Sequence, residues 1–363
     1  MKILVLGSDS NVLHAHSNSQ ERALSYSTLV EKYIVVVPAE EDLIQEVNER
    51  LVVSGVKREF SIFTLLKLYK QAKQLVKKYN VEIVSAQNPF EYALLGYFLK
   101  RSCGIRLHIQ EHGDFFSYTY WRNEKCIHFF RYYLGKFLIK KADSVRVVSK
   151  KIQHTLEGFG LKSDRITVIP VFVPNVNSIK IDRMQARVCV CIIRFVKQKN
   201  PLMLLRAWKH VLEKQPDAKL ILVGKGEMQS EIKQCIKNFK LEKSVQLHGW
   251  TNDTSQMYKK ADLHVLSSNY EGWGRVVIEA AVQGLPTVMT DVGCAGEFIE
   301  NETSGLITSI NDEKAFADAI IRIMQDDAFY RKLCVGISKS LQKLPNHQET
   351  LRLYLDSWKK ALL

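Results

Sequence analysis

Short apolar runs rich in β-branched residues recur along the chain, separated by longer segments with helical spacing. In the first half these predicted strands are residues 2–6, 33–37, 81–85, 105–109, 144–148 and 166–169. Residues 61–78 place apolar side chains three and four positions apart and lysines on the other side, which predicts an amphipathic helix. Strands that alternate with helices favour a parallel sheet covered by helices.

The same alternation starts again after Pro170, Pro174 and the polar stretch that follows them. The second set of predicted strands is residues 187–193, 218–223, 244–248, 261–266, 286–290 and 305–308. A chain of 363 residues is also longer than one hydrophobic core normally supports. We therefore predict an α/β protein with two Rossmann-like, doubly wound parallel-sheet domains that face a cleft, residues 1–175 and 187–345, joined by a linker at 176–186.

The composition is that of an ordinary folded protein, with 46% hydrophobic and 25% charged residues. No apolar run approaches the roughly 20 residues that span a bilayer, and a strand occupies the place of a secretory signal. The seven cysteines form no C-x-x-C pair, and their odd number rules out complete internal pairing. These features favour a reducing cytoplasm and buried thiols at Cys189 and Cys191.

Positive charge is concentrated in one part of the chain. The net charge is +14, but residues 51–200 alone hold 27 Lys and Arg against 10 Asp and Glu. Such a basic region suits anionic lipid, the phosphates of a ligand or nucleic acid, and a solvated lysine-rich surface is the plain alternative. Aromatic and basic residues interleave at 118–122 and 128–137, so we predict peripheral contact with the inner face of an anionic membrane, with a buried helix as the alternative.

The densest candidate for chemistry is the segment 267–286, directly after a predicted strand. Gly272 and Gly274 allow its loop to approach a ligand closely, and a short helix is predicted from Arg275 to Gln283. The unpaired N–H groups and partial positive charge of the helix start suit a diphosphate.

Two glutamates accompany this helix start. Glu271 precedes the helix and Glu279 lies within it, and carboxylates accept hydrogen bonds from sugar hydroxyls. Taken alone, the pair equally fits an acid that stabilises a helix N-terminus and a glutamate on a polar face. Their spacing across a glycine-rich turn resembles the retaining family 4 glycosyltransferases of the GT-B fold. That resemblance implies that Glu271 contacts the transferred sugar, Glu279 the nucleotide ribose, and the loop at 290–297 the sugar and phosphates.

A basic element supports the same resemblance. Arg194 and Lys199 follow the first predicted strand of the second domain and are similar to the family's Arg-x4-Lys element. Two cations there stabilise the negative charge that grows on a departing diphosphate, although a solvated basic turn is the alternative. The other donor-binding residues that the resemblance implies are Gly272, Trp273, Gly274, Arg275, Val276, Gly224, Gly249 and Trp250.

The first domain supplies the acceptor side. His112 follows a predicted strand and resembles the family's acceptor-side histidine, whereas a histidine in this position is otherwise most often structural. The loop at Gly7, Ser8 and Asp9 departs from the family's Gly-Gly turn, and with Asp114 it completes the acceptor-side candidates.

The resemblance implies a retaining glycosyltransferase that moves a sugar from a UDP- or GDP-linked donor to a saccharide or lipid-linked acceptor in cell-surface glycan or polysaccharide biosynthesis. Its implied catalytic residues are Glu271, His112, Arg194 and Lys199, with no cofactor and no metal, and its last segment, 346–363, resembles the family's helix that crosses back to the first domain. A sugar-nucleotide epimerase or hydrolase on the same scaffold is the main alternative. A non-enzymatic nucleic-acid binder is disfavoured, because the sequence carries no RNA-binding signature.

Overall fold

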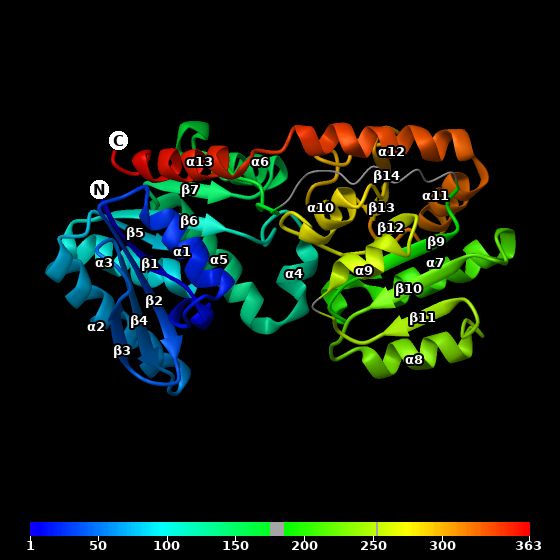
Figure 1. Ribbon diagram of the computed structural model, residues 1–363. Coiled ribbons are helices and arrows are strands. Elements are labelled where there is room, and N and C mark those ends of the chain that lie inside the picture. Colours follow the sequence, from blue (N-terminus) through cyan, green and yellow to red (C-terminus); the bar gives the residue numbers. More distant parts are fainter. Residues whose placement is uncertain (175–184, 252) are drawn as a thin grey trace. The chain divides into compact units, whose positions relative to one another are not determined.

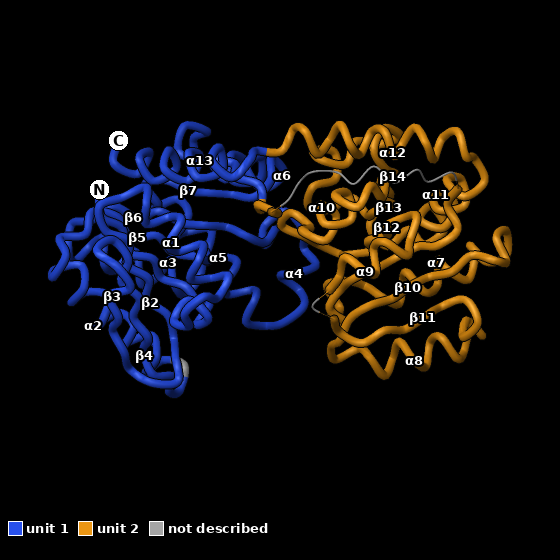
Figure 2. The backbone as a smooth tube through the Cα atoms, in the orientation of Figure 1, with its two compact units in different colours: residues 1–170, 345–363 blue, residues 171–344 orange. Residues whose placement is uncertain are grey.

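The chain forms two compact units. The computed structural model describes residues 1–174, 185–251 and 253–363. The first unit consists of residues 1–170 and 345–363, and the second consists of residues 171–344 (Figure 2). The predicted linker at 176–186 lies, apart from its last two residues, outside the described part of the chain.

The first unit is built on an eight-stranded sheet (Figure 1). The strand order is β3-β4-β2-β1-β5-β6-β7-β8, and every neighbouring pair is parallel except β3 with β4. The strands are β1 (Lys2–Leu6), β2 (Lys32–Ala39), β3 (Leu43–Glu46), β4 (Leu51–Lys57), β5 (Ile83–Ala86), β6 (Arg106–Glu111), β7 (Ser144–Val147) and β8 (Ile166–Val168). The sequence pattern did not predict the β3–β4 hairpin, because β3 is short and mostly exposed and Ser54 and Gly55 interrupt the apolar run of β4.

Helices cover this sheet. They are η1 (Ser10–Leu13), α1 (Asn18–Ser27), α2 (Ser61–Tyr79), α3 (Glu91–Cys103), α4 (Thr119–Glu124), α5 (Cys126–Lys141), α6 (Lys150–Gly158), η2 (Ser163–Arg165) and α13 (His347–Lys359). The helix predicted at 61–78 is α2, which packs on β1, β2 and β4 and contacts α3. In turn, α3 packs on β5 and β6 and contacts α5.

The last helix, α13, is anchored on the sheet by buried polar contacts. Asn346 and Glu349 form a capping box at its start. Ser357 contacts His108 Nε2 at 2.9 Å through its hydroxyl, and its carbonyl accepts from the Ser144 hydroxyl at 3.0 Å. Because the contacts join β6 and β7 to the end of the chain, α13 is part of the first unit's core.

The second unit contains a six-stranded, fully parallel sheet (Figure 1). Its order is β11-β10-β9-β12-β13-β14, with β9 (Val188–Ile192), β10 (Lys219–Val223), β11 (Val245–His248), β12 (Leu263–Leu266), β13 (Thr287–Thr290) and β14 (Gly305–Thr308). Its helices are η3 (Lys197–Lys199), α7 (Pro201–Lys214), α8 (Gln229–Asn238), α9 (Thr254–Lys259), α10 (Arg275–Val282), α11 (Glu313–Gln325) and α12 (Asp327–Gln342). The direction of winding reverses between β9 and β12, and ligands of such sheets bind beyond the carboxyl ends of the strands at this switch point.

Two expectations from the composition concerned the cysteines on the first strand of the second unit and membrane-spanning helices. Cys189 and Cys191 are free, buried thiols on β9, and burial raises the pKa of both. Within residues 1–174, 185–251 and 253–363, no helix combines the length and the apolar character needed to cross a membrane.

Candidate functional site

The loops that leave β9 and β12 are bound to each other at the switch point of the second sheet. The Asn269 backbone N–H donates to the Gln198 carbonyl at 2.8 Å, and the Asn269 side chain donates to the Lys197 carbonyl at 2.9 Å. Gln198 Nε2 returns a hydrogen bond to the Tyr270 carbonyl at 3.1 Å. The segment that follows each strand is therefore held in place by the other.

This arrangement brings two of the predicted catalytic residues together. Lys199 Nζ and Glu271 Oε1 form an ion pair, and their side chains are only 14% and 7% exposed. The Ser268 hydroxyl donates to the same carboxylate oxygen at 2.7 Å. A carboxylate with two donors on one oxygen is fixed in orientation, and the Lys199 ammonium retains further N–H donors for a ligand.

Arg194 lies apart from this pair. Its guanidinium is exposed and contacts Gln198 Oε1 at 3.4 Å. It lines a pocket of about 410 Å³ with Val196, Lys225, Gly226 and Trp250. The structure therefore associates Arg194 with Trp250, another predicted donor-binding residue, and associates Lys199 with Glu271.

Two of the predicted donor-side glycines differ in their surroundings. A Cβ on Gly224 would lie 1.9 Å from the Ile193 carbonyl oxygen, so glycine is required where the loops after β9 and β10 meet. Gly249 has open space around its Cα and is exposed. Neither glycine lines the 410 Å³ pocket, whereas Gly226 does.

The short helix predicted after the glycine loop is α10, which spans Arg275–Val282. Gly274 caps it with a left-handed backbone, at φ 89°. Arg275 Nε donates to Glu279 Oε1 at 2.8 Å, and the Tyr258 hydroxyl lies 3.5 Å from Glu279 Oε2. Val276, in the first turn, accepts from the same tyrosine through its carbonyl at 3.2 Å. Glu279 is thus oriented from two sides.

The loop after β13 packs closely against the glycine-rich segment at residues 271–274. A Cβ on Gly293 would lie 2.6 Å from the Trp273 carbonyl oxygen and 2.9 Å from Glu271 Cβ. The Cys294 N–H donates to the Trp273 carbonyl at 2.9 Å. The indole of Trp273 is itself buried, with Nε1 enclosed and unbonded, and Gly272 beside it is buried too. Close packing of the loop after β13 against the glycine-rich segment therefore fixes the backbone position of Glu271.

In the first unit, two of the five acceptor-side candidates line a cavity of about 250 Å³. It is lined by Asp9, Val12, Ser19, Arg22, Ala23, Tyr26, Tyr33, Val35, Val37, Gln87, Gln110, His112 and Tyr354. Asp9 and His112 were predicted from the sequence. Gly7, Ser8 and Asp114 do not line it: Gly7 is buried against the Gln87 side chain, Ser8 is exposed, and Asp114 is only 1% exposed.

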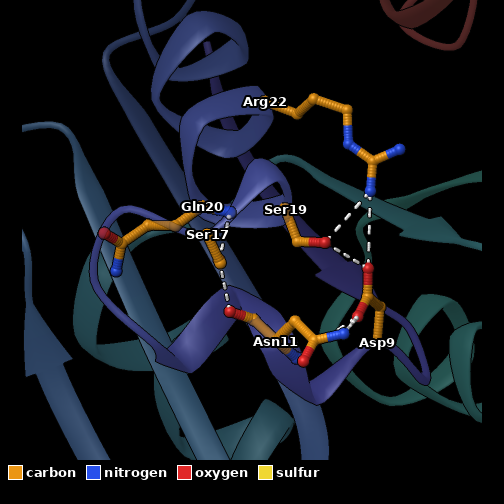
Figure 3. A network of polar contacts seen from close by, with 6 residues as sticks. All are labelled: Asp9, Asn11, Ser17, Ser19, Gln20 and Arg22. Atoms are coloured by element: carbon orange, nitrogen blue, oxygen red, sulfur yellow. Dashed lines mark hydrogen bonds and ion pairs between the residues drawn. The ribbon is translucent and has the colours of Figure 1, made fainter. Parts of the chain in front are cut away.

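Asp9 is held in a polar network (Figure 3). Its Oδ1 accepts from the backbone and side chain of Asn11 at 3.2 and 3.0 Å. Its Oδ2 accepts from the Ser19 hydroxyl and lies 3.4 Å from Arg22 Nη2, which also donates to Ser19 at 3.1 Å (Figure 3). The carboxylate therefore serves first to organise the loop after β1 and the start of α1.

His112 is controlled by Arg146, a buried residue of β7 that sequence reasoning missed. Arg146 Nη1 lies 2.7 Å from His112 Nδ1, and its Nη2 donates to the Ile169 carbonyl at 2.8 Å. Burial around the ring and the adjacent guanidinium charge of Arg146 lower the pKa of His112, although the residue itself is exposed. The imidazole is therefore neutral, with Nδ1 accepting from Arg146 and Nε2–H left as a donor. The Tyr354 ring packs against the guanidinium at 5.1 Å.

Two buried acids lie beside His112. Glu111 and Asp114 are 0% and 1% exposed, and each has one carboxylate oxygen without a hydrogen-bond partner. Burial raises the pKa of both, and the two carboxyl groups reinforce the effect at Glu111. Across the described residues, no three His, Cys, Asp or Glu side chains are grouped as metal ligands.

Comparisons with known proteins now add to this geometry. The family described as "Glycosyl transferases group 1" matches residues 178–339, and the family described as "Glycosyltransferase Family 4" matches residues 31–174. A curated relative, the UDP-Gal:alpha-D-GlcNAc-diphosphoundecaprenol alpha-1,3-galactosyltransferase of Escherichia coli, is 32% identical over 136 residues. That match covers 37% of this chain and 35% of the relative, so the chain aligns with about a third of that protein.

Solved structures match over nearly the full length. Sucrose-phosphate synthase from Thermosynechococcus elongatus has a TM-score of 0.82 at 18% identity and covers 99% of both chains. Anabaena HepE in complex with UDP has a TM-score of 0.77 at 18% identity and covers 99% of this chain and 100% of its own. The two matched families, together with this fold, show that the chain belongs to the family 4 type of glycosyltransferases with the GT-B fold.

Proposed function

We propose that the protein transfers a sugar, with retention of its anomeric configuration, from a nucleoside diphosphate sugar to a lipid-linked or saccharide acceptor. The observation that carries this proposal is the Lys199–Glu271 ion pair at the switch point, just before the first turn of α10. The pair joins a cation suited to a diphosphate with a carboxylate suited to sugar hydroxyls. A nucleotide sugar carries its diphosphate directly beside its sugar hydroxyls, so one ligand can meet both side chains.

In the proposed donor complex, the diphosphate lies at the unpaired N–H groups of the α10 start, within reach of Lys199. Glu271 accepts from the sugar hydroxyls and Glu279 from the ribose hydroxyls. Arg194 and Trp250 line the 410 Å³ pocket, which suits a planar base beside a phosphate. The positive charges stabilise the leaving diphosphate most strongly in the transition state, where its negative charge is greatest.

Retention requires the acceptor to attack from the face that the diphosphate leaves. The bond between the anomeric carbon and the phosphate oxygen breaks, the acceptor oxygen bonds to that carbon, and the acceptor proton passes to the departing phosphate. Glu271 orients the sugar in this scheme and forms no covalent bond, in keeping with the two donors that already occupy Oε1. On the acceptor side, neutral His112 donates through Nε2–H to a sugar hydroxyl.

The Escherichia coli relative suggests the chemical class of both substrates. Its name specifies a uridine diphosphate sugar and an acceptor sugar linked through a diphosphate to a polyprenol. The similar HepE structure holds UDP. We therefore propose uridine as the donor base and a diphosphate-linked lipid as the acceptor carrier, as in the assembly of cell-surface glycans.

The test combines binding and product analysis. UDP, GDP and ADP are compared as thermal stabilisers of the purified protein, because a ligand raises the unfolding temperature according to its affinity. Nucleoside diphosphate sugars that carry the most stabilising base and different sugars are then supplied with a lipid-diphosphate-linked acceptor. The anomeric configuration of the product is determined by NMR. A product with the donor's anomeric configuration that the Glu271→Gln variant no longer forms supports the proposal. Epimerised or hydrolysed donor as the main product, with or without acceptor, contradicts it and favours the epimerase or hydrolase alternative.

A further inference from the structure

Exposed apolar side chains are concentrated on one part of the first unit. The large hydrophobic residues exposed among the described residues include ten on α2, α3 and α5 and at the cap of α2. These ten are Phe60, Ile62, Phe63, Leu66, Phe98, Ile127, Phe129, Phe130, Tyr133 and Phe137. The helices of the second unit expose one such residue, Val335. Exposed apolar residues that cluster in this way mark a contact surface more often than isolated ones do.

The three helices form one continuous face. Tyr69 of α2 meets Phe98 of α3 with ring centroids 6.5 Å apart, and Tyr97 of α3 meets Phe137 of α5 at 5.9 Å. We call the exposed side chains of α2, α3 and α5, with Phe60, the aromatic-basic face. Ring contacts across both helix boundaries mean that the exposed apolar groups form one surface.

Apolar and basic residues occupy different ends of this face. In α2 the exposed positions change from Ile62, Phe63 and Leu66 to Lys70 and Lys77. In α5 they change from Phe130, Tyr133 and Phe137 to Lys140 and Lys141. The three helices contain eleven Lys and Arg residues but one acid, Glu91. Lysines are favoured at a helix C-terminus by the helix dipole, but the dipole gives no reason to expose aromatic rings at the other end.

The parallel sheet of the first unit determines at which of its edges the starts and the ends of α2, α3 and α5 lie. The strands that precede these helices are parallel, so each helix start lies toward the carboxyl edge of the sheet and each helix end toward the amino edge. The rings therefore lie toward the edge that carries Asp9 and His112. The lysines form a second band at the opposite edge.

We infer that the aromatic-basic face docks the first unit on an anionic phospholipid surface, with its rings in the interface and its lysines against the headgroups. Protein interfaces are depleted in lysine, whereas anionic membranes attract it, so the charge favours lipid over a protein partner. Lys70, Lys77 and Lys140 make no ion pair with a carboxylate in the described parts of the chain, which leaves their charge available. The inference gives the proposed lipid-linked acceptor a route to the site and rests on that proposed function for its purpose.

The aromatic-basic face only partly coincides with the segments predicted from the sequence to contact a membrane. Of the two segments predicted to contact a membrane, 128–137 supplies exposed rings, although His128 is buried. The other segment, 118–122, holds Trp121 at 4% exposure, stacked between Phe90 and His128. The largest ring of the predicted segments therefore belongs to the core, and α2 exposes apolar groups that its amphipathic pattern had separated from the lysine side.

The experiment measures sedimentation of the full chain with vesicles of phosphatidylcholine alone or with phosphatidylglycerol. We expect binding to the anionic vesicles that is at least about tenfold stronger and weakens with salt. Phe63→Ser with Phe130→Ser should reduce that binding on the order of tenfold, and Lys70→Glu with Lys140→Glu should remove the preference for phosphatidylglycerol. Val335→Ser, an exposed apolar residue of the second unit, is the matched control and should bind like the wild type.

Several results would overturn the inference. These are equal binding to both vesicle types, unchanged binding by the phenylalanine variant, or a dimer in solution that the same variant dissociates. Sugar transfer to a water-soluble acceptor is measured in parallel and should be unchanged in all variants. Loss of docking with intact transfer, or the reverse, therefore separates a failure of this inference from a failure of the proposed function.

Discussion

The two units build their candidate sites in different ways. In the second unit, the loops after β9 and β12 supply Arg194, Lys199 and Glu271, and hydrogen bonds join those loops directly. In the first unit, the cavity is lined by residues that range from Asp9 to Tyr354 along the sequence. A site made from two loops at a switch point leaves a local spacing in the sequence, whereas a site made from many elements leaves none.

The electrostatics differ in the same sense. The second unit pairs the partly buried ammonium of Lys199 with the buried carboxylate of Glu271. The first unit encloses two carboxyl groups and sets a guanidinium against a neutral imidazole. The second unit thus places a pair of opposite charges at its candidate site, whereas the first unit places a neutral imidazole beside the Asp9–Arg22 ion pair in its cavity.

The largest effect is expected from the ion pair of the second unit. Lys199→Met and Glu271→Gln should each lower kcat/KM for sugar transfer on the order of 10²- to 10³-fold, because the proposed function assigns Lys199 to the leaving diphosphate and Glu271 to the transferred sugar. Each single change also leaves a buried charge without its partner, which should lower the unfolding temperature. Steady-state kinetics and thermal unfolding of the same preparations measure both effects.

The double variant separates function from structure. Lys199→Met with Glu271→Gln removes both charges, so its unfolding temperature should lie above that of either single variant. Its transfer rate should stay as low as theirs. Recovery of activity together with stability would mean that the pair serves only the fold, and near-normal turnover in the single variants would contradict the assignment outright.

The next effect concerns the first unit. His112→Ala should lower transfer roughly tenfold to a hundredfold by removing a hydrogen bond to the acceptor or transferred sugar, with the affinity for UDP nearly unchanged. Arg146→Met should give part of the same loss, because it frees Nδ1 and lets the ring change tautomer. Kinetics with varied acceptor, beside UDP titration by calorimetry, tests both variants. A matched loss of UDP affinity would place His112 on the donor side instead.

The sequence predicted those elements and site residues whose signal lies in neighbouring positions along the chain. The helix predicted at 275–283 is α10 at Arg275–Val282, because glycines and a proline mark both of its ends. By contrast, Arg22, Gln87 and Tyr354 carry no pattern, since only packing of α1, β5 and α13 brings them to one cavity. Arg146 was hidden for a related reason, as it occupies one position of a short buried strand.

A smaller effect is expected at the loop beneath Glu271. Gly293→Ala places a Cβ 2.6 Å from the Trp273 carbonyl oxygen and 2.9 Å from Glu271 Cβ, so the glycine-rich segment must shift. We expect transfer to fall about tenfold, since small displacements of positioning groups are costly. Gly296→Ala is the control in the same loop: its φ of 77° is also positive, but a Cβ there meets nothing within 4 Å. Equal losses in both variants would assign the effect to backbone strain alone.

The smallest effect is one of stability and has the opposite sign. Glu111 is fully buried with Oε2 unpaired, and burial holds its pKa well above the usual value in the folded state. The folded protein therefore binds this proton more tightly than the unfolded chain does, so Glu111 makes the fold progressively less stable as the pH rises above about 4. Glu111→Gln removes that penalty and should raise the free energy of unfolding at pH 7.

The pH dependence makes this last prediction specific. Below about pH 4 both states hold the proton, so the advantage of Glu111→Gln should vanish there. Glu40→Gln, at an exposed position of the same unit, should leave the unfolding free energy nearly unchanged at both pH values. Urea unfolding at pH 4 and pH 7 measures the difference. A Glu111→Gln variant that is less stable at pH 7 would mean that the carboxylate is ionised and paired in the native protein, and the contrast between paired charge in one unit and enclosed neutral acid in the other would then fail.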